Sequence, residues 1–423
     1  MRYSTKLLAA RVATLIVGLI SNMSIASQII SKQGVSEYAY FAAITALPMF
    51  LPFADLGLGT ALLSKFATIS DKTGREISLL SGAFFKVLTV LFLVVALAMV
   101  PLSYFHFWEF IFPSNGTESR DLYCSCIVAG TFLATPFSLA FRKLQYQNRI
   151  LSIVAIQGFI PVISWALISA IFYLGLSSQV CVLCPMVAYL VTSLFSFHFS
   201  RIYRELQFTK ITTSLRLSRD SFHLGFWSIS LMITGVGVSQ LPRVLLLWRD
   251  KTDIATCYSF ILMVLTPAMS LFSVLASAKV VDFLRLVSIN EIREFMKHQT
   301  GKLILPLILI SSGNLFIPVV AWKFGFAFLS FNQSLSIIPI IILSSLTQFN
   351  LSVQISKYLL RRNTIICIMV LFVEIIIFFQ VDPKTYFNFL FFVIFPAWLS
   401  LTILTFRNYV SIKTWIQNEI SSK

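Results

Sequence analysis

The stretch LLSGAFFKVLTVLFLVVALAMVPLSY, residues 79–104, decides the fold class of this chain. Its only charged residue is Lys86, and aliphatic or aromatic residues fill most of the other positions. A helix needs about 20 consecutive apolar residues to cross the hydrocarbon core of a bilayer. This stretch is long enough, so we predict a transmembrane helix over residues 79–104.

Comparable apolar runs recur on both sides of this stretch. Of the 423 residues, 57% are hydrophobic and 12% are charged, whereas soluble domains have about 25% charged residues. The sequence therefore predicts an all-α polytopic membrane protein with about twelve transmembrane helices. The predicted spans cover residues 7–30, 38–62, 79–104, 122–140, 151–173, 180–199, 221–242, 254–278, 303–322, 334–356, 364–380 and 386–406.

The basic residues lie mainly in alternate connecting segments. About 24 of the 33 Lys and Arg residues fall on the side of the N-terminus and about 7 on the other side. Because Lys and Arg are retained in the cytoplasm, both termini are predicted to be cytoplasmic. This topology, with contact to bilayer headgroups, explains the net charge of +16 without a nucleic-acid partner.

A basic loop at residues 200–220 lies near the middle of the chain, with six predicted spans on either side. Many transporters build a central cavity between two such halves. We therefore predict two six-helix bundles, residues 1–205 and 206–423. Most of the 14 prolines lie in or at the ends of spans, where they kink helices and favour a protein that changes shape.

The motifs of common enzymes and motors are missing from the sequence. It has no G-x-x-x-x-G-K-[ST] phosphate loop, no G-x-S-x-G element and no metal-binding spacing among its four histidines. We therefore predict no catalytic residues, no metal, no cofactor and no enzymatic activity. Uphill transport by this chain would need an ion gradient or a partner protein.

Four ionisable residues fall inside predicted spans: Arg11, Asp55, Lys86 and Glu374. Such residues are costly in the hydrocarbon layer and usually face a partner or an aqueous cavity. Arg11, Asp55 and Lys86 are predicted on the cytoplasmic side, where an anionic substrate would be loaded. Snorkelling is the alternative for Arg11 and Lys86, and a local helix cap is the alternative for Asp55.

Glu374 is predicted near mid-depth in LFVEIIIFF, where its side chain is too short to reach water. It is therefore either paired or protonated, which makes it a candidate for ion coupling. At the ends of spans, Arg142, Lys143 and Arg243 are candidates for electrostatic guidance of a phosphate-bearing headgroup. Positive-inside topology explains Arg142 and Lys143 equally well, although it does not explain Arg243.

Three segments resemble one family. Residues 28–67, QIISKQGVSEYAYFAAITALPMFLPFADLGLGTALLSKFA, resemble the first helical hairpin of bacterial polysaccharide exporters. FRKLQYQNR at 141–149 and HLGFW at 223–227 are also similar to that family. With twelve spans and cytoplasmic termini, the chain resembles a Wzx-type lipid-linked oligosaccharide flippase. This family belongs to the multidrug/oligosaccharidyl-lipid/polysaccharide exporter (MOP) superfamily.

The resemblance implies alternating access by a V-shaped pair of bundles in the bacterial inner membrane. The implied cargo is an undecaprenyl-diphosphate-linked oligosaccharide, an O-antigen or similar repeat unit, moved from the cytoplasmic to the periplasmic leaflet. By analogy Arg11 and Lys86 would hold the diphosphate, and Asp55 or Glu374 would couple transport to a cation or proton. A polysaccharide polymerase and a chain-length regulator are implied partners. The two basic and two acidic intramembrane residues depart from the cationic cavity that the family often has.

Two alternatives remain open at this stage. A cation-coupled multidrug antiporter would depend on Glu374 and would tolerate the loss of Arg11 and Lys86. A membrane polysaccharide polymerase would need catalytic residues in an outside loop, where segment 105–121 offers only His106 and Arg120.

Overall fold

The computed structural model describes residues 2–47, 75–112, 119–147, 149–204, 206, 211–263, 266, 338–347 and 357–405. All regular secondary structure in these ranges is helical. The chain forms two compact units, Met1–Ser259 and Phe260–Lys423. This division follows α10 (Ile211–Trp248) and lies later than residue 205. The two predicted six-helix bundles, residues 1–205 and 206–423, stay a prediction.

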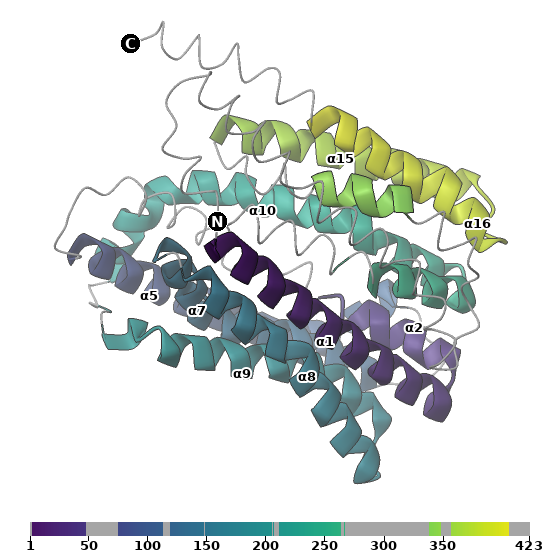
Figure 1. The fold of residues 1–423 in the computed structure, drawn as a ribbon, viewed down its shortest axis with the longest axis horizontal. Coiled ribbons are helices and arrows are strands. Elements are labelled where there is room, and N and C mark those ends of the chain that lie inside the picture. The colour runs from purple at the N-terminus through teal and green to yellow at the C-terminus, as the bar shows by residue number, and fades with distance from the viewer. Residues whose placement is uncertain are drawn as a thin grey trace, which may run out of the picture. The chain divides into compact units, whose positions relative to one another are not determined.

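The first unit contains most of the described helices (Figure 1). Besides α10, they are α1 (Arg2–Gln33), α2 (Val35–Ile44), α5 (Arg75–Tyr104), α6 (Phe107–Ile111), α7 (Ser119–Tyr146), α8 (Ile150–Tyr173) and α9 (Cys184–Phe199), with the short 3-10 helices η1 (Ser178–Leu183) and η2 (Ile202–Arg204). A further helix, Thr252–Met263, begins in this unit and continues past its last residue, Ser259.

The described part of the second unit is also helical. It consists of a helix over Ile338–Thr347, then α15 (Lys357–Gln380), α16 (Tyr386–Phe389) and a π-helical turn, η3 (Leu390–Ile394), that opens the apolar helix Leu390–Thr405.

Six described helices are long and apolar enough to cross a bilayer, which confirms a multi-span membrane protein. They contain the predicted spans 79–104, 122–140, 151–173, 180–199 and 364–380 and most of 7–30. Their apolar segments are Ala9–Gln33, Ser78–Tyr104, Arg120–Tyr146, Ile150–Tyr173, Gln179–Phe199 and Arg361–Gln380. The predicted span 303–322 lies outside the described residues, as does most of each of the predicted spans 38–62, 254–278 and 334–356.

The helix α5 has one face in the protein and one face turned outward. Phe84, Leu88 and Phe92 are fully buried and pack with Leu139 of α7. On the opposite side, Leu93, Val94, Leu97 and Val100 are 53–68% exposed. Such a row of exposed aliphatic side chains would be unfavourable in water and suits contact with lipid.

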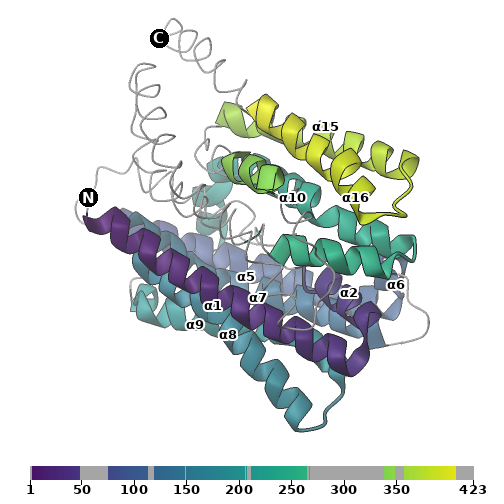
Figure 2. The ribbon, with the colours of Figure 1, turned by 45° about the vertical axis from the view of Figure 1, so that its right-hand side comes forward.

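The helices α1 and α8 pack closely along their length (Figures 1 and 2). Gly18 lies against Pro161, Thr14 lies against Gly158, and Gln28 Nε2 donates to Ser169 Oγ at 3.1 Å. These pairs advance together along both helices, so α1 and α8 run in the same direction, as predicted for the first and fifth spans. Small residues permit this close approach of transmembrane helices.

Replacing Gly158 with alanine is expected to destabilise the first unit. A Cβ atom at this position would lie 2.5 Å from Thr14 Cγ2, and overpacking of this kind costs about 1–3 kcal/mol. Gly235→Ala is the matched control, because nothing lies within 4 Å of a Cβ atom there. Thermal unfolding of the purified variants should show a lower midpoint for Gly158→Ala alone. Equal midpoints would contradict the α1–α8 packing.

Candidate functional site

Arg11 lies in α1, near the start of the apolar segment Ala9–Gln33. The residue is only 8% exposed, and its Nε atom has no hydrogen-bond acceptor among the described residues. Arg11 shares a helix face with Thr14 and Gly18, the residues that approach α8. A snorkelling guanidinium would be exposed to water, so this burial favours a position inside the protein.

Lys86 lies in α5 and is half-buried beside the core residues Phe84 and Val87. The principal contacts of α5 are with α7 and α10, whereas those of α1 are with α8 and α2. Lys86 and Arg11 therefore lie on helices with different packing partners. Their participation in one diphosphate site stays a prediction.

The structure describes only one of the two candidate carboxylates. Asp55 lies outside the described residues. Glu374 lies in α15, in the second unit, and is 1% exposed. Neither of its carboxyl oxygens has a hydrogen-bond partner among the described residues. A buried polar group without a partner is rare and needs an explanation, such as a bound ion or a proton.

Lys143 and Arg142 lie in the last turns of α7. Lys143 is 5% exposed, and its Nζ atom donates to the Ser200 carbonyl, at the C-terminal end of α9, at 3.3 Å. A cation there satisfies a terminal carbonyl and interacts favourably with the helix dipole. Arg142 is half-buried and makes a long contact, 3.4 Å, with Gln145 Oε1. Lys143 thus joins two helices, and headgroup guidance by either residue stays a prediction.

The position of Arg243 differs from the sequence-based expectation. The predicted span ended at residue 242, but α10 continues to Trp248 and places Arg243 inside the helix. The residue is 9% exposed, and its Nη1 and Nη2 atoms donate to the carbonyls of Ala42 at 3.0 Å and Ser259 at 3.4 Å. Arg243 therefore links α10 to α2, which contains Ala42, and to the helix Thr252–Met263, which contains Ser259. Headgroup guidance by Arg243 is untested, and these contacts favour a structural role.

Replacing Arg243 with glutamine is therefore expected to lower stability. The substitution removes charge-assisted hydrogen bonds that are worth about 1.5–3 kcal/mol each. Thermal unfolding of the purified variant would measure the loss. A variant with unchanged stability and reduced transport would instead support headgroup guidance.

The sequence did not predict a polar cluster that the structure shows at the predicted outer end of the first unit. Arg120 pairs with Glu37 at 2.9 Å and lies over the Tyr40 ring at 4.1 Å. These residues line a cavity of about 30 Å³ with Tyr123. Glu37 and Arg120 are far apart in the chain, so no local pattern could reveal the pair.

His106 also has a carboxylate partner, because its Nδ1 atom lies 3.1 Å from Asp121 Oδ2. His106 and Arg120, the candidate catalytic residues of the polymerase alternative, are thus each paired with a carboxylate.

Comparison with known proteins identifies the class of fold. Over 99% of both chains, the protein matches the crystal structure of the MATE transporter VcmN from Vibrio cholerae in its bent form, with a TM-score of 0.63 and 13% identity. It also matches a eukaryotic MATE transporter, AtDTX14, over 97% of this chain and 96% of that chain, with a TM-score of 0.63 and 13% identity.

A third match is a MOP superfamily transporter from Pyrococcus furiosus. The TM-score is 0.62 at 14% identity, over 99% of this chain and 95% of that chain. That protein is described as having a binding pocket of reversed polarity. No protein-family model and no curated protein sequence matches the chain.

The chain therefore has the MATE-like fold of MOP superfamily transporters. These matches cover essentially the whole chain, which agrees with a multi-span protein of two helical bundles. At 13–14% identity the likeness establishes the fold alone.

Proposed function

We propose that this protein is a flippase for a lipid-linked oligosaccharide. It moves an undecaprenyl-diphosphate-linked repeat unit, such as an O-antigen unit, from the cytoplasmic to the periplasmic leaflet of a bacterial inner membrane. Transport proceeds by alternating access and is coupled to an ion gradient. A polysaccharide polymerase and a chain-length regulator act with it.

The observation that carries this proposal is the burial of Arg11 in α1. A guanidinium that is 8% exposed, with an Nε donor that has no described acceptor, offers a strong site for an anion. A diphosphate supplies acceptor oxygens and negative charge of the required kind. Arg11 is also predicted close to the cytoplasmic side, where the diphosphate headgroup of the substrate is made available.

The fold is compatible with such a substrate. A MOP superfamily transporter with a pocket of reversed polarity is among the matched structures, so pockets of different polarity occur on this fold. The resemblance of residues 28–67, 141–149 and 223–227 to polysaccharide exporters favours an oligosaccharide lipid over a small cation.

Glu374 supports ion coupling in the same proposal. A carboxyl group that is 1% exposed and has no described partner is a suitable carrier for a proton. Protonation and deprotonation of such a group can bias the two conformations of an alternating-access cycle.

Leaflet-resolved labelling of the repeat unit in cells depleted of this protein tests the proposal. The probe is a sugar-reactive reagent that cannot cross the inner membrane. We expect the lipid-linked unit to accumulate where only permeabilised cells are labelled. Accumulation of single units in the outer leaflet would show that translocation is intact and would overturn the proposal.

A cation-coupled multidrug antiporter is the second candidate, because the buried Glu374 and the MATE-like fold both favour it. The two functions predict different phenotypes for cells that lack the protein. Cells that lack the protein and remain normal in polysaccharide, but become sensitive to cationic drugs, would establish the antiporter.

A further inference from the structure

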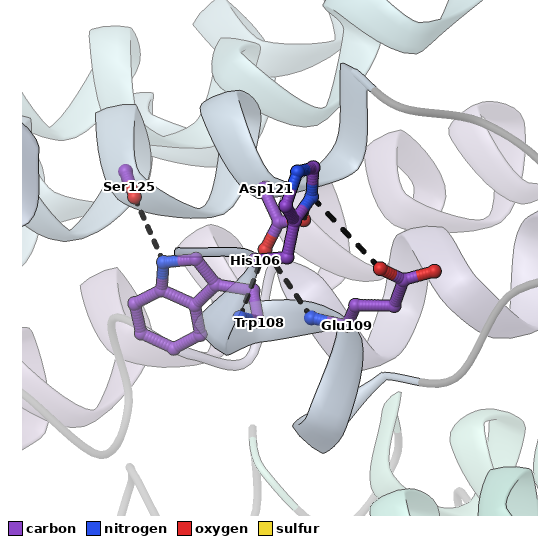
Figure 3. A network of polar contacts seen from close by, with 5 residues as sticks. All are labelled: His106, Trp108, Glu109, Asp121 and Ser125. Carbon is purple, nitrogen blue, oxygen red and sulfur yellow. Dashed lines mark hydrogen bonds and ion pairs between the residues drawn. The ribbon is translucent and has the colours of Figure 1, made fainter. Parts of the chain in front are cut away.

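A histidine and two carboxylates meet where the chain passes from α5 to α7 (Figure 3). His106 precedes α6, Glu109 lies in α6, and Asp121 lies in the first turn of α7. His106 Nδ1 is 3.1 Å from Asp121 Oδ2 and 3.9 Å from Glu109 Oε2. One ligand-type atom from each residue lies within 4.8 Å of the other two.

The surrounding contacts fix one of the three side chains. Asp121 is 6% exposed, and its Oδ1 atom accepts the backbone N–H groups of Trp108 at 2.8 Å and Glu109 at 3.2 Å. The Trp108 indole is held in turn by Ser125, whose Oγ atom accepts from Nε1 at 2.8 Å. Outer contacts of this kind orient metal ligands before an ion arrives. Oδ2 of Asp121 is the oxygen that faces His106 (Figure 3).

The other two side chains are accessible. The side chains of His106 and Glu109 are 59% and 58% exposed, so an ion can enter and water can complete its coordination. Zn²⁺ binds a histidine nitrogen and carboxylate oxygens at about 2.0–2.2 Å. Tetrahedral ligands at that radius are about 3.4 Å apart, close to the two separations measured from His106 Nδ1.

We propose that His106, Glu109 and Asp121 bind a Zn²⁺-class dication at the predicted outer face of the protein. The site goes beyond transport and does not rest on the identity of the substrate. The two carboxylates balance the charge of the ion. When the metal binds, the Nδ1 proton that His106 donates to Asp121 passes to solvent; the imidazole then coordinates the ion through the Nδ1 lone pair and, as a neutral ring, carries its one proton on Nε2. The imidazole nitrogen selects Zn²⁺ over Mg²⁺ and Ca²⁺, which prefer oxygen ligands alone.

Zinc titration of the full-length protein tests this site. The protein is purified in lipid nanodiscs, any histidine tag is removed, and Zn²⁺ affinity is measured by competition with a chromophoric chelator. We expect one equivalent of Zn²⁺ to bind, and we expect His106→Ala and Glu109→Gln each to weaken binding by about tenfold or more. Millimolar Mg²⁺ should not displace the bound Zn²⁺.

The matched control is His198→Ala. His198 is also exposed, but it lies in α9 and stacks on Tyr203, so this variant should bind Zn²⁺ as the unchanged protein does. Glu109 and His106 are preferred to Asp121 for substitution, because Asp121 also holds the start of α6. Equal Zn²⁺ affinity in the unchanged protein and in His106→Ala would overturn the proposal. Equally strong loss in His198→Ala, or displacement by Mg²⁺, would do the same.

Discussion

Replacing Arg11 with glutamine is expected to reduce delivery of the repeat unit to the outer leaflet by at least about tenfold. Loss of one partner in a desolvated charge pair costs about 2–5 kcal/mol, and about 1.4 kcal/mol corresponds to a factor of ten. Arg11→Lys should retain part of the activity, because it keeps the charge but loses the planar fork that holds a diphosphate. Leaflet-resolved labelling of cells with equal amounts of each variant measures the effect.

The matched control for Arg11 is Arg204→Gln. Arg204 is exposed in η2, and its guanidinium contacts the ring and hydroxyl of Tyr203, so its loss should leave transport unchanged. Lys86→Met should reduce transport in the same direction as Arg11→Gln if both cations hold the diphosphate. Full activity of Arg11→Gln, at normal protein level, would contradict an anion-binding role for this residue.

Replacing Glu374 with glutamine is expected to abolish gradient-driven transport without loss of stability. An ionised carboxylate at the centre of a transmembrane helix costs about 2.5–3.5 kcal/mol on insertion scales, and the amide is nearly isosteric. The variant should therefore unfold at the same temperature as the unchanged protein or at a higher one. Its transport should no longer respond to an imposed proton or sodium gradient.

Two measurements on the same preparation separate coupling from structure at Glu374. Thermal unfolding reports on packing, and transport with and without a gradient reports on coupling. If Glu374→Gln lowers the unfolding temperature and slows transport equally under both conditions, the carboxyl group has a structural role. Asp382→Asn, at an exposed carboxylate that pairs with Lys384 beyond α15, is the control.

The fold class was predictable from the sequence because the hydrocarbon core imposes a simple rule on length and polarity. The run at 79–104 and the helix α5 agree closely, since α5 ends at Tyr104. Helix ends were less predictable where the protein supplies hydrogen-bond acceptors for a charged side chain. Arg243 suggested the end of a span, but backbone carbonyls of Ala42 and Ser259 accept its hydrogen bonds and allow α10 to continue.

The candidate site was predictable only in part. Arg11 and Glu374 stand out in the sequence because charges are rare in apolar runs, and both are buried in the structure. The ion pair of Glu37 with Arg120 and the contact of His106 with Asp121 join residues of different segments of the chain. Hydropathy and charge patterns give no information about such pairs, because the pairs depend on how the helices pack.

Reconstitution of the purified protein is the most direct test of the proposed flippase. The lipid-linked repeat unit, isolated from depleted cells in which it accumulates, is placed in proteoliposomes, and a membrane-impermeant reagent reports the fraction accessible from outside. We expect the protected half of the substrate to become accessible with the unchanged protein, and far more slowly with Arg11→Gln. Substrate that stays protected at the rate of protein-free liposomes would contradict translocation of a lipid-linked oligosaccharide by this protein.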